Sequence, residues 1–134
     1  MENLTSTEIA QYRSALSALS EAMVALDIIE DCEGDVEDAA ISIALQAGQE
    51  PNQSDQWLEG LAKRWRASIC RSEDASEEGS VRHAIEAGNL AEAAEKLVAV
   101  STLPTRLAVP VLICVLQLGI EPFCRPLDES LRSI

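Results

Sequence analysis

The sequence predicts an all-α protein, a single bundle of six or seven helices packed around a central apolar helix. No charged residue occurs in the stretch 107–120 (LAVPVLICVLQLGI), so a helix there is apolar on every side and needs other helices to cover it. Helix-capping patterns recur along the rest of the chain and predict those helices. Aromatic residues make up only 3% of the sequence, so the core consists mainly of Ala, Leu, Ile and Val, which suits closely packed helices.

The length and the charge of the chain limit its organisation and its partners. The 134 residues correspond to one domain, 1–134, which is large enough to fold without a metal or a disulfide. The net charge is −13, and residues 1–50 contain eleven acidic residues but a single basic one, Arg13. Nucleic acid and anionic membranes repel such a surface, so we expect neither as a partner. The stretch 107–120 is also shorter than the roughly 20 apolar residues that cross a bilayer.

The cysteines and the N-terminus predict a cytoplasmic protein. Cys32, Cys70, Cys114 and Cys124 are too far apart in sequence to form a metal-binding pair such as C-x-x-C. The first residues do not combine a basic region with a following apolar run, as a secretory signal would. We therefore expect four reduced thiols and a cytoplasmic location.

The first predicted helix begins at a capping box and is long. Thr5 and Glu8 have the spacing at which each side chain caps the other's backbone N–H. Apolar residues then recur at spacings of three and four, which forms an a/d seam. The seam consists of Ile9, Tyr12, Leu16, Leu19, Met23 and Leu26. It packs on the central helix or on a second copy of itself, and the second alternative gives a homodimer. Gly34 ends the helix, and Asp35 caps the next one.

The middle of the chain predicts a basic third helix and a loop. After a second helix that stops at Gly48, Ser54 is a suitable N-cap for the third. One stripe of this helix is apolar and consists of Trp57, Leu61, Trp65 and Ile69. The segment 72–80 (SEDASEEGS) is polar, acidic and rich in small residues, so we interpret it as a mobile loop. A short helix then covers 81–87.

Two segments of the chain share one pattern. Residues 34–40 and 88–94 each place a Gly at a helix end and an Asx residue at the next N-cap, and a Pro follows after a similar interval. This pattern indicates two related αα-hairpins, or common capping chemistry that has recurred by chance.

The C-terminal third contains the central helix and a segment that should be irregular. Pro104 fits the first turn of the central helix, where a missing N–H is tolerated. We expect Leu112 and Leu116 to be fully buried. After the helix ends at Gly119, Pro122 and Pro126 should keep the chain irregular before a last amphipathic turn at 127–134.

An acidic cluster at 27–38 is the strongest candidate for a chemical site. Asp27 and Asp31 lie one helical turn apart, and Glu30 and Asp38 are near them in sequence. Carboxylates on facing helices bind Mg²⁺ or Mn²⁺ in all-helical phosphohydrolases. Here the acidic residues flank a single helix junction that Gly34 interrupts. A solvated, cap-rich junction therefore explains the same residues.

Other motifs do not indicate catalysis. A basic helix that carries Trp57 and Trp65 could bind nucleic acid, but both Trp side chains fall on the side assigned to the core. Its basic residues more simply face acidic helices of the same chain or of a second copy. His83 is the single histidine, and no Ser or Cys in its neighbourhood suggests a triad.

These observations favour a protein that is not an enzyme. The leading hypothesis is a non-catalytic protein–protein interaction module, an adaptor, regulator or assembly factor, whose acidic surface binds a basic protein surface or a second copy. The first alternative is a metal-dependent phosphohydrolase that uses Asp27, Glu30, Asp31 and Asp38 and takes Mg²⁺ or Mn²⁺ as its cofactor; no cofactor is expected otherwise. The second alternative is an acidic mimic of nucleic acid that blocks a basic protein surface.

Overall fold

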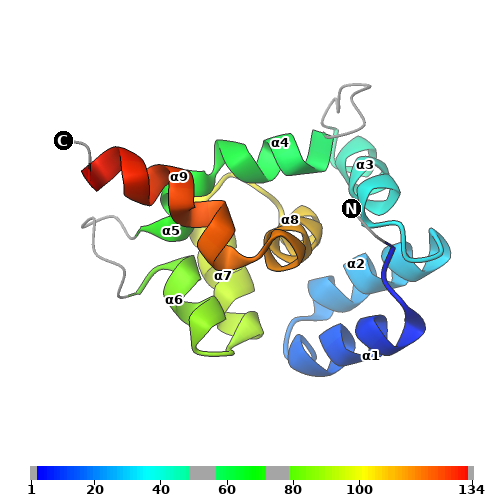
Figure 1. The fold of residues 1–134 in the computed structure, drawn as a ribbon. Coiled ribbons are helices and arrows are strands. Elements are labelled where there is room, and N and C mark those ends of the chain that lie inside the picture. Colours follow the sequence, from blue (N-terminus) through cyan, green and yellow to red (C-terminus); the bar gives the residue numbers. More distant parts are fainter. Residues whose placement is uncertain (1–2, 49–56, 72–78, 133–134) are drawn as a thin grey trace.

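The computed structural model describes residues 3–48, 57–71 and 79–132, and all regular structure in these ranges is helical (Figure 1). The all-α prediction is confirmed. The predicted number of six or seven helices is wrong, because these ranges contain nine. They are α1 (Ser6–Ala15), α2 (Ser20–Asp31), α3 (Val36–Gln46), α4 (Trp57–Arg64), α5 (Arg66–Cys70), α6 (Val81–Glu86), α7 (Leu90–Val100), α8 (Thr105–Leu118) and α9 (Ile120–Arg132). The predicted N-cap Ser54 and residues 72–78 of the predicted loop lie outside the described residues.

The apolar helix α8 is in contact with five others. Every residue from Leu107 to Val115 is buried, and α8 packs against α2, α3, α4, α7 and α9. Pro110 lies inside the helix without ending it. Leu112 is buried as predicted, but the prediction for Leu116 is wrong, since it is only half-buried near the end of the helix. Among the described residues no single helix could span a membrane; α7 and α8 together have the required length and composition, but they meet at a bend of 118°.

The long first helix of the prediction is two helices. The capping box at Thr5 and Glu8 forms, but α1 ends at Ala15 and α2 starts at Ser20. A straight helix over both would be about 40 Å long and would carry its first half away from the core. The turn instead lets α1 pack against α2 and buries Leu16 and Leu26 inside the chain. Burial of apolar surface therefore outweighs the continuity of the helix.

The basic helix of the prediction is also broken in two. Trp65 lies between α4 and α5, and its backbone N–H bonds to the carbonyl of Ala62 in a tighter turn. Of the predicted apolar stripe, Leu61 and Ile69 are buried, and the two Trp side chains are partly buried. The stripe therefore faces the core across both helices.

The prediction of an irregular segment after Gly119 is wrong, because α9 forms through both prolines. Pro122 is the third residue of α9, where an N–H has no partner inside the helix in any case. Pro126 lacks the N–H that would bond to the carbonyl of Pro122, so the helix loses one bond. The burial of Phe123 and Cys124 offsets that loss.

The expectation of four reduced thiols is wrong as well. Cys70 at the end of α5 and Cys124 on α9 form a disulfide, with Cα atoms 5.8 Å apart, and both are fully buried. The two residues are separated by 54 positions, and their proximity depends on the packing of α5 against α9. Cys32 and Cys114 are free, and burial raises the pKa of the Cys114 thiol to about 11.

The two segments with a shared pattern form the same local structure. Gly34 and Gly88 both have a positive φ, of 84° and 78°, a conformation that favours glycine. Asp35 then accepts a hydrogen bond from the backbone N–H of Asp38, and Asn89 accepts one from that of Glu92. The helices that follow, α3 and α7, both pack against α8.

Candidate functional site

The turn between α2 and α3 carries an exposed group of carboxylates that we call the acidic junction. It consists of Asp27, Glu30, Asp31, Glu33 and Asp38, all of which are exposed. The turn itself is well defined, because the N–H of Gly34 bonds to the carbonyl of Ile29 (2.9 Å) and the N–H of Leu4 bonds to the carbonyl of Gly34 (2.8 Å). Figure 1 shows the N-terminal segment beside this turn. Glu33 lies in this turn, Asp27, Glu30 and Asp31 lie on α2 before it, and Asp38 lies on α3 after it.

Within the described part of the chain, the acidic junction forms ion pairs with Arg13 of α1. The guanidinium of Arg13 forms ion pairs with Asp27 (2.8 Å) and Glu30 (3.1 Å). The hydrogen bond to Asp27, followed by that to Glu30, raises the pKa of Arg13. Both carboxylates still expose more than 60% of their side chains, at 65% and 63%. The junction thus keeps a large excess of accessible negative charge.

The four proposed metal ligands lie on two helices, α2 and α3. Asp27 and Glu30 are brought together by Arg13, Asp31 ends α2, and Asp38 lies in the first turn of α3. Among the residues that the structure describes, no group of three or more His, Cys, Asp or Glu side chains could hold a metal ion. Only two of the four carboxylates therefore share a cation, and that cation is Arg13.

Two acidic residues next to the junction have structural tasks. Asp35 caps α3, as predicted. Glu37 belongs to the acidic stretch 27–38 of the sequence, yet its Oε1 accepts a hydrogen bond from the backbone N–H of Leu58 (2.9 Å) and so links α3 to α4. Burial raises the pKa of the Glu37 carboxyl, and Asp35 adds to the increase, while hydrogen bonds from the backbone of α4 partly oppose it. Sequence carries no sign of this contact, because α4 begins about 20 residues later.

Cys32 lies at the junction but is not an activated nucleophile. It is the C-cap of α2 and is partly buried. Burial raises the pKa of its thiol, and the carboxylates of Asp38, Asp35 and Asp31 raise it further. The reactive form of cysteine is the thiolate, which this environment disfavours.

The basic residues of α4 and α5 make contacts away from the acidic junction. Lys63 pairs with Glu59 on its own helix (3.2 Å), Arg71 pairs with Asp128 (3.4 Å), and the guanidinium of Arg66 lies 5.0 Å from the ring centre of Phe123. In the ion pairs of the described residues, the cation that contacts the acidic junction is therefore Arg13 and not a residue of α4 or α5. The basic residues of α4 and α5 and the acidic junction are thus separate features of the described surface.

A shallow groove lies elsewhere on α2 and α3. Its volume is about 350 Å³, and it is bounded by the starts of α2 and α8 and the end of α3. An ion pair between Arg106 and Glu21 crosses from α8 to α2 in its wall. Ile43 and Pro104 give the groove an apolar part, so it combines both kinds of surface.

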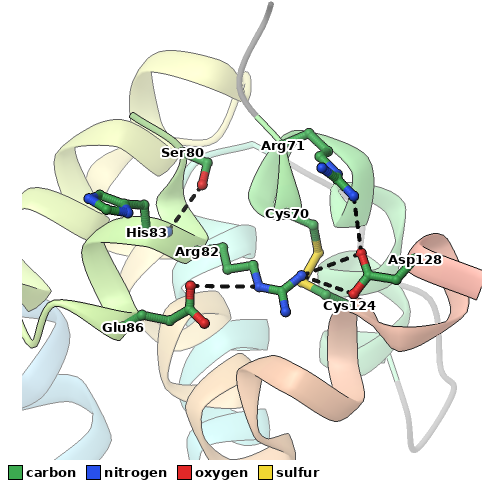
Figure 2. Close-up of a disulfide and its surroundings, with 8 residues drawn as sticks. All are labelled: Cys70, Arg71, Ser80, Arg82, His83, Glu86, Cys124 and Asp128. Carbon is green, nitrogen blue, oxygen red and sulfur yellow. Dashed lines mark hydrogen bonds and ion pairs between the residues drawn. A yellow bond between two sulfur atoms is a disulfide. The ribbon is translucent and has the colours of Figure 1, made fainter. Parts of the chain in front are cut away.

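His83 lies in the first turn of α6. Its backbone N–H donates to Ser80 Oγ (3.1 Å) as part of the cap of α6, and its ring is exposed. Figure 2 shows the ring directed away from Cys70 and Cys124.

Comparison of the chain with protein-family models, with curated proteins and with solved structures found no match.

Proposed function

We propose that the chain is a non-catalytic interaction module that binds a basic protein surface through the acidic junction. The observation that carries the proposal is the set of five exposed carboxylates where α2 meets α3, for which Arg13 is the ion-pair partner found among the described residues. Charges arranged in this way steer a positively charged partner and fix its orientation more than they add affinity. Three of the five, Asp31, Glu33 and Asp38, lie outside the ion pairs that Arg13 makes.

Capture with matched variants tests the proposal. The immobilised chain is compared with Asp31→Asn/Asp38→Asn and with a control, Glu95→Gln/Glu121→Gln, which changes the net charge equally on α7 and α9. All four side chains are exposed. We expect a basic protein from the native lysate to bind the wild type and the control, and to be lost with the junction variant. Equal capture by all three, or equal loss in both variants, would contradict the proposal.

Competition separates the nucleic-acid mimic from a general interaction module. A mimic occupies the nucleic-acid site of its partner, so DNA or RNA should displace the captured protein from the chain. An adaptor that binds another basic surface should tolerate nucleic acid at the same ionic strength.

The metal-dependent phosphohydrolase uses the same carboxylates and has its own test. A metal that binds the folded chain at Asp27, Glu30, Asp31 and Asp38 would raise the Tm by mass action. We expect millimolar Mg²⁺ or Mn²⁺ to leave the Tm of the wild type unchanged. A shift of several degrees that Asp27→Asn/Asp31→Asn abolishes would replace our proposal with the hydrolase.

A second copy of the chain is the other partner to test. Leu16 and Leu26 of the a/d seam are buried inside the chain, so a homodimer would need another surface. Contact between the acidic junction of one copy and the basic residues of α4 of the other would provide such a surface. Sedimentation over a wide range of dilution should show a mass that falls as ion pairs between copies dissociate; a constant monomer mass would exclude the homodimer.

Cytoplasmic location is still a prediction, and the disulfide provides its test. Disulfides persist mainly in oxidising compartments, so a cytoplasmic chain would keep Cys70 and Cys124 reduced. When thiols are trapped by acid at lysis and alkylated in denaturant, so that the buried Cys114 also reacts, label on all four cysteines indicates a reducing location. Labelling of Cys32 and Cys114 alone would contradict a reducing location.

A further inference from the structure

Helix α9 depends on its neighbours to stay helical. It has 13 residues, a length at which an isolated helix is marginal in water, and it contains Pro122 and Pro126. A proline inside a helix disfavours the helix further. What favours α9 is its apolar side, where Phe123 and Cys124 are buried against the rest of the chain. Without that packing, α9 should lose its structure.

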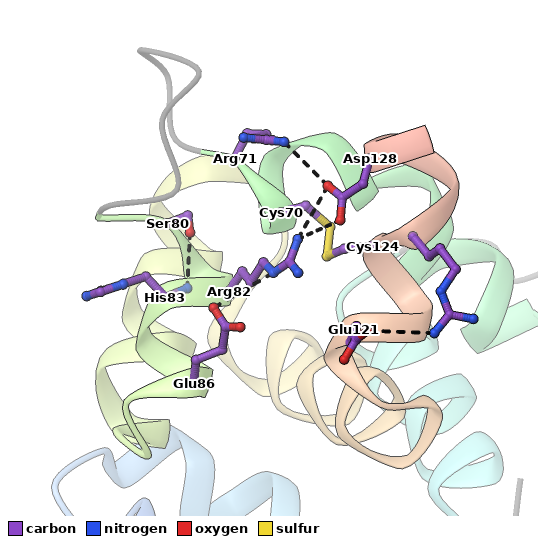
Figure 3. Close-up of polar contacts among 10 residues, drawn as sticks. Cys70, Arg71, Ser80, Arg82, His83, Glu86, Glu121, Cys124 and Asp128 are labelled. Carbon is purple, nitrogen blue, oxygen red and sulfur yellow. Dashed lines mark hydrogen bonds and ion pairs between the residues drawn. A yellow bond between two sulfur atoms is a disulfide. The ribbon is translucent and has the colours of Figure 1, made fainter. Parts of the chain in front are cut away.

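The contacts that hold α9 converge on α5 and α6. Cys124 is bonded to Cys70 at the end of α5. One turn further along α9, Asp128 forms ion pairs with Arg71 (3.4 Å) and with Arg82 of α6 (3.1 Å) (Figure 2). Figure 3 shows that Glu121, nearer the start of α9, points away from this group. The disulfide is thus a covalent bond within a group of contacts that hold the middle of α9 against α5 and α6.

The start of α9 has the geometry of a hinge. Gly119 separates α8 from α9 with φ 89° and ψ 128°, a conformation that L side chains rarely adopt. A change of φ and ψ at such a glycine swings α9 without disturbing α8. The helices α2, α3, α4 and α7 pack on α8, whereas α9 packs on α5, α6 and α8. The larger part of the core is therefore independent of α9.

We propose that the disulfide between Cys70 and Cys124 is a redox-sensitive lock on α9. A dithiol reductant opens it in two steps. One thiolate of the reductant attacks a sulfur of the bond, forms a mixed disulfide and releases the other cysteine as a thiol after protonation. The second thiolate of the reductant displaces the remaining cysteine. The reductant leaves as its own disulfide, and Cys70 and Cys124 each gain one electron and one proton.

Reduction then leaves α9 held by weaker contacts. The ion pairs of Asp128 remain after reduction, and the side chains of Arg82 and Asp128 expose only 10% and 18% of their surface, but these contacts are not covalent and separate when α9 moves. Because both sulfur atoms are buried, a reductant reaches them only when α9 opens. Once the bond is reduced, α9 opens more readily than before. The reduced chain thereby exposes the apolar side of α9 and the surface of α5 and α6 beneath it.

Hydrogen exchange with and without dithiothreitol tests the lock on the full chain. We expect reduction to speed the exchange of α9 amides by about tenfold or more, while α2, α3 and α7 keep their protection. A hydrophobic dye should bind the reduced chain more strongly. The variant Cys70→Ser/Cys124→Ser should behave as the reduced wild type and should not respond to dithiothreitol. The control Cys32→Ser should respond as the wild type does.

Three results would overturn the lock. If α9 keeps its protection after reduction, packing alone holds it. If all helices lose protection together, the disulfide stabilises the whole fold and not α9 in particular. If dithiothreitol does not reduce the bond in the folded chain, the disulfide is permanent. The measurements on reduced wild type decide the first two results even if the serine variant does not fold.

Discussion

Glu37 lies on the most acidic part of the chain, yet its carboxylate faces inward to α4. Burial raises its pKa above the ordinary value of 4.5. A carboxyl with a raised pKa binds more protons in the folded than in the unfolded chain. Its contribution to the free energy of unfolding is therefore largest at low pH and is lost as the pH rises through the shifted pKa.

Replacement of Glu37 by Gln tests this sign. Glutamine keeps an oxygen that can accept the hydrogen bond from Leu58 N–H, and it removes the buried charge. We expect Glu37→Gln to match or slightly exceed the wild type in stability at neutral pH. The two should converge as the pH falls and Glu37 becomes protonated. Urea unfolding across this pH range measures the difference, with Glu95→Gln as an exposed control. A wild type clearly more stable than Glu37→Gln at neutral pH would contradict the assignment.

Gly34 and Gly88 form a second matched pair of residues. Both have a positive φ, so alanine should cost roughly 1–2 kcal/mol of backbone strain at either position. At Gly34 the added Cβ also collides with the backbone carbonyl of Leu4, whereas at Gly88 it meets open space. We therefore expect Gly34→Ala to lose more stability than Gly88→Ala, as measured by denaturant midpoints. Equal losses would show that the N-terminal segment is not fixed against the acidic junction.

At the scale of the element, α8 predicts a contrast between two leucines four residues apart. Leu112 is almost fully buried, and Leu116 is only partly so. Truncation of a buried leucine to alanine costs about 2–5 kcal/mol, through lost transfer energy and the cavity left behind. We expect Leu112→Ala to fall in this range and Leu116→Ala to cost clearly less in the same thermal or urea titration. If both variants unfold with the wild type, α8 does not form the core.

The helices that sequence located best are those with local signals at their starts. The caps at Thr5, Asp35 and Asn89 depend on residues three positions apart, and all three form as predicted. The breaks at 16–19 and at Trp65 carry no Gly or Pro to mark them. They arise because folding back buries more apolar surface than a straight helix could. Helix propensity is similarly overridden in α9, where packing and a disulfide outweigh two prolines.

In the candidate site, too, the sequence predicted local features and missed contacts between distant segments. Exposure of Asp27, Glu30, Asp31 and Asp38 follows from the high local density of acidic residues, and the sequence suggested it. The contact of Glu37 with α4 and the bond between Cys70 and Cys124 depend on chain segments that meet only after folding. Charge pattern therefore predicts where the surface is acidic, while the partners of individual side chains require the structure.

At the scale of the whole molecule, most of the net charge of −13 lies in residues 1–50, which contain the acidic junction. In the described part of 1–50, Arg13 pairs with Asp27 and Glu30 and leaves the other three carboxylates of the acidic junction accessible. Repulsion among these carboxylates opposes folding, and salt screens it. A basic partner would reduce the same repulsion, so its binding would also stabilise the folded chain.

The most direct test of this account is the dissociation constant of the captured partner at low and at physiological ionic strength. We predict that Asp31→Asn/Asp38→Asn weakens binding by about three- to tenfold at low salt, less at higher salt, because screened surface charges are worth little individually. Glu95→Gln/Glu121→Gln should bind as the wild type does. An equal loss in both variants, or an affinity independent of salt, would contradict recognition through the acidic junction.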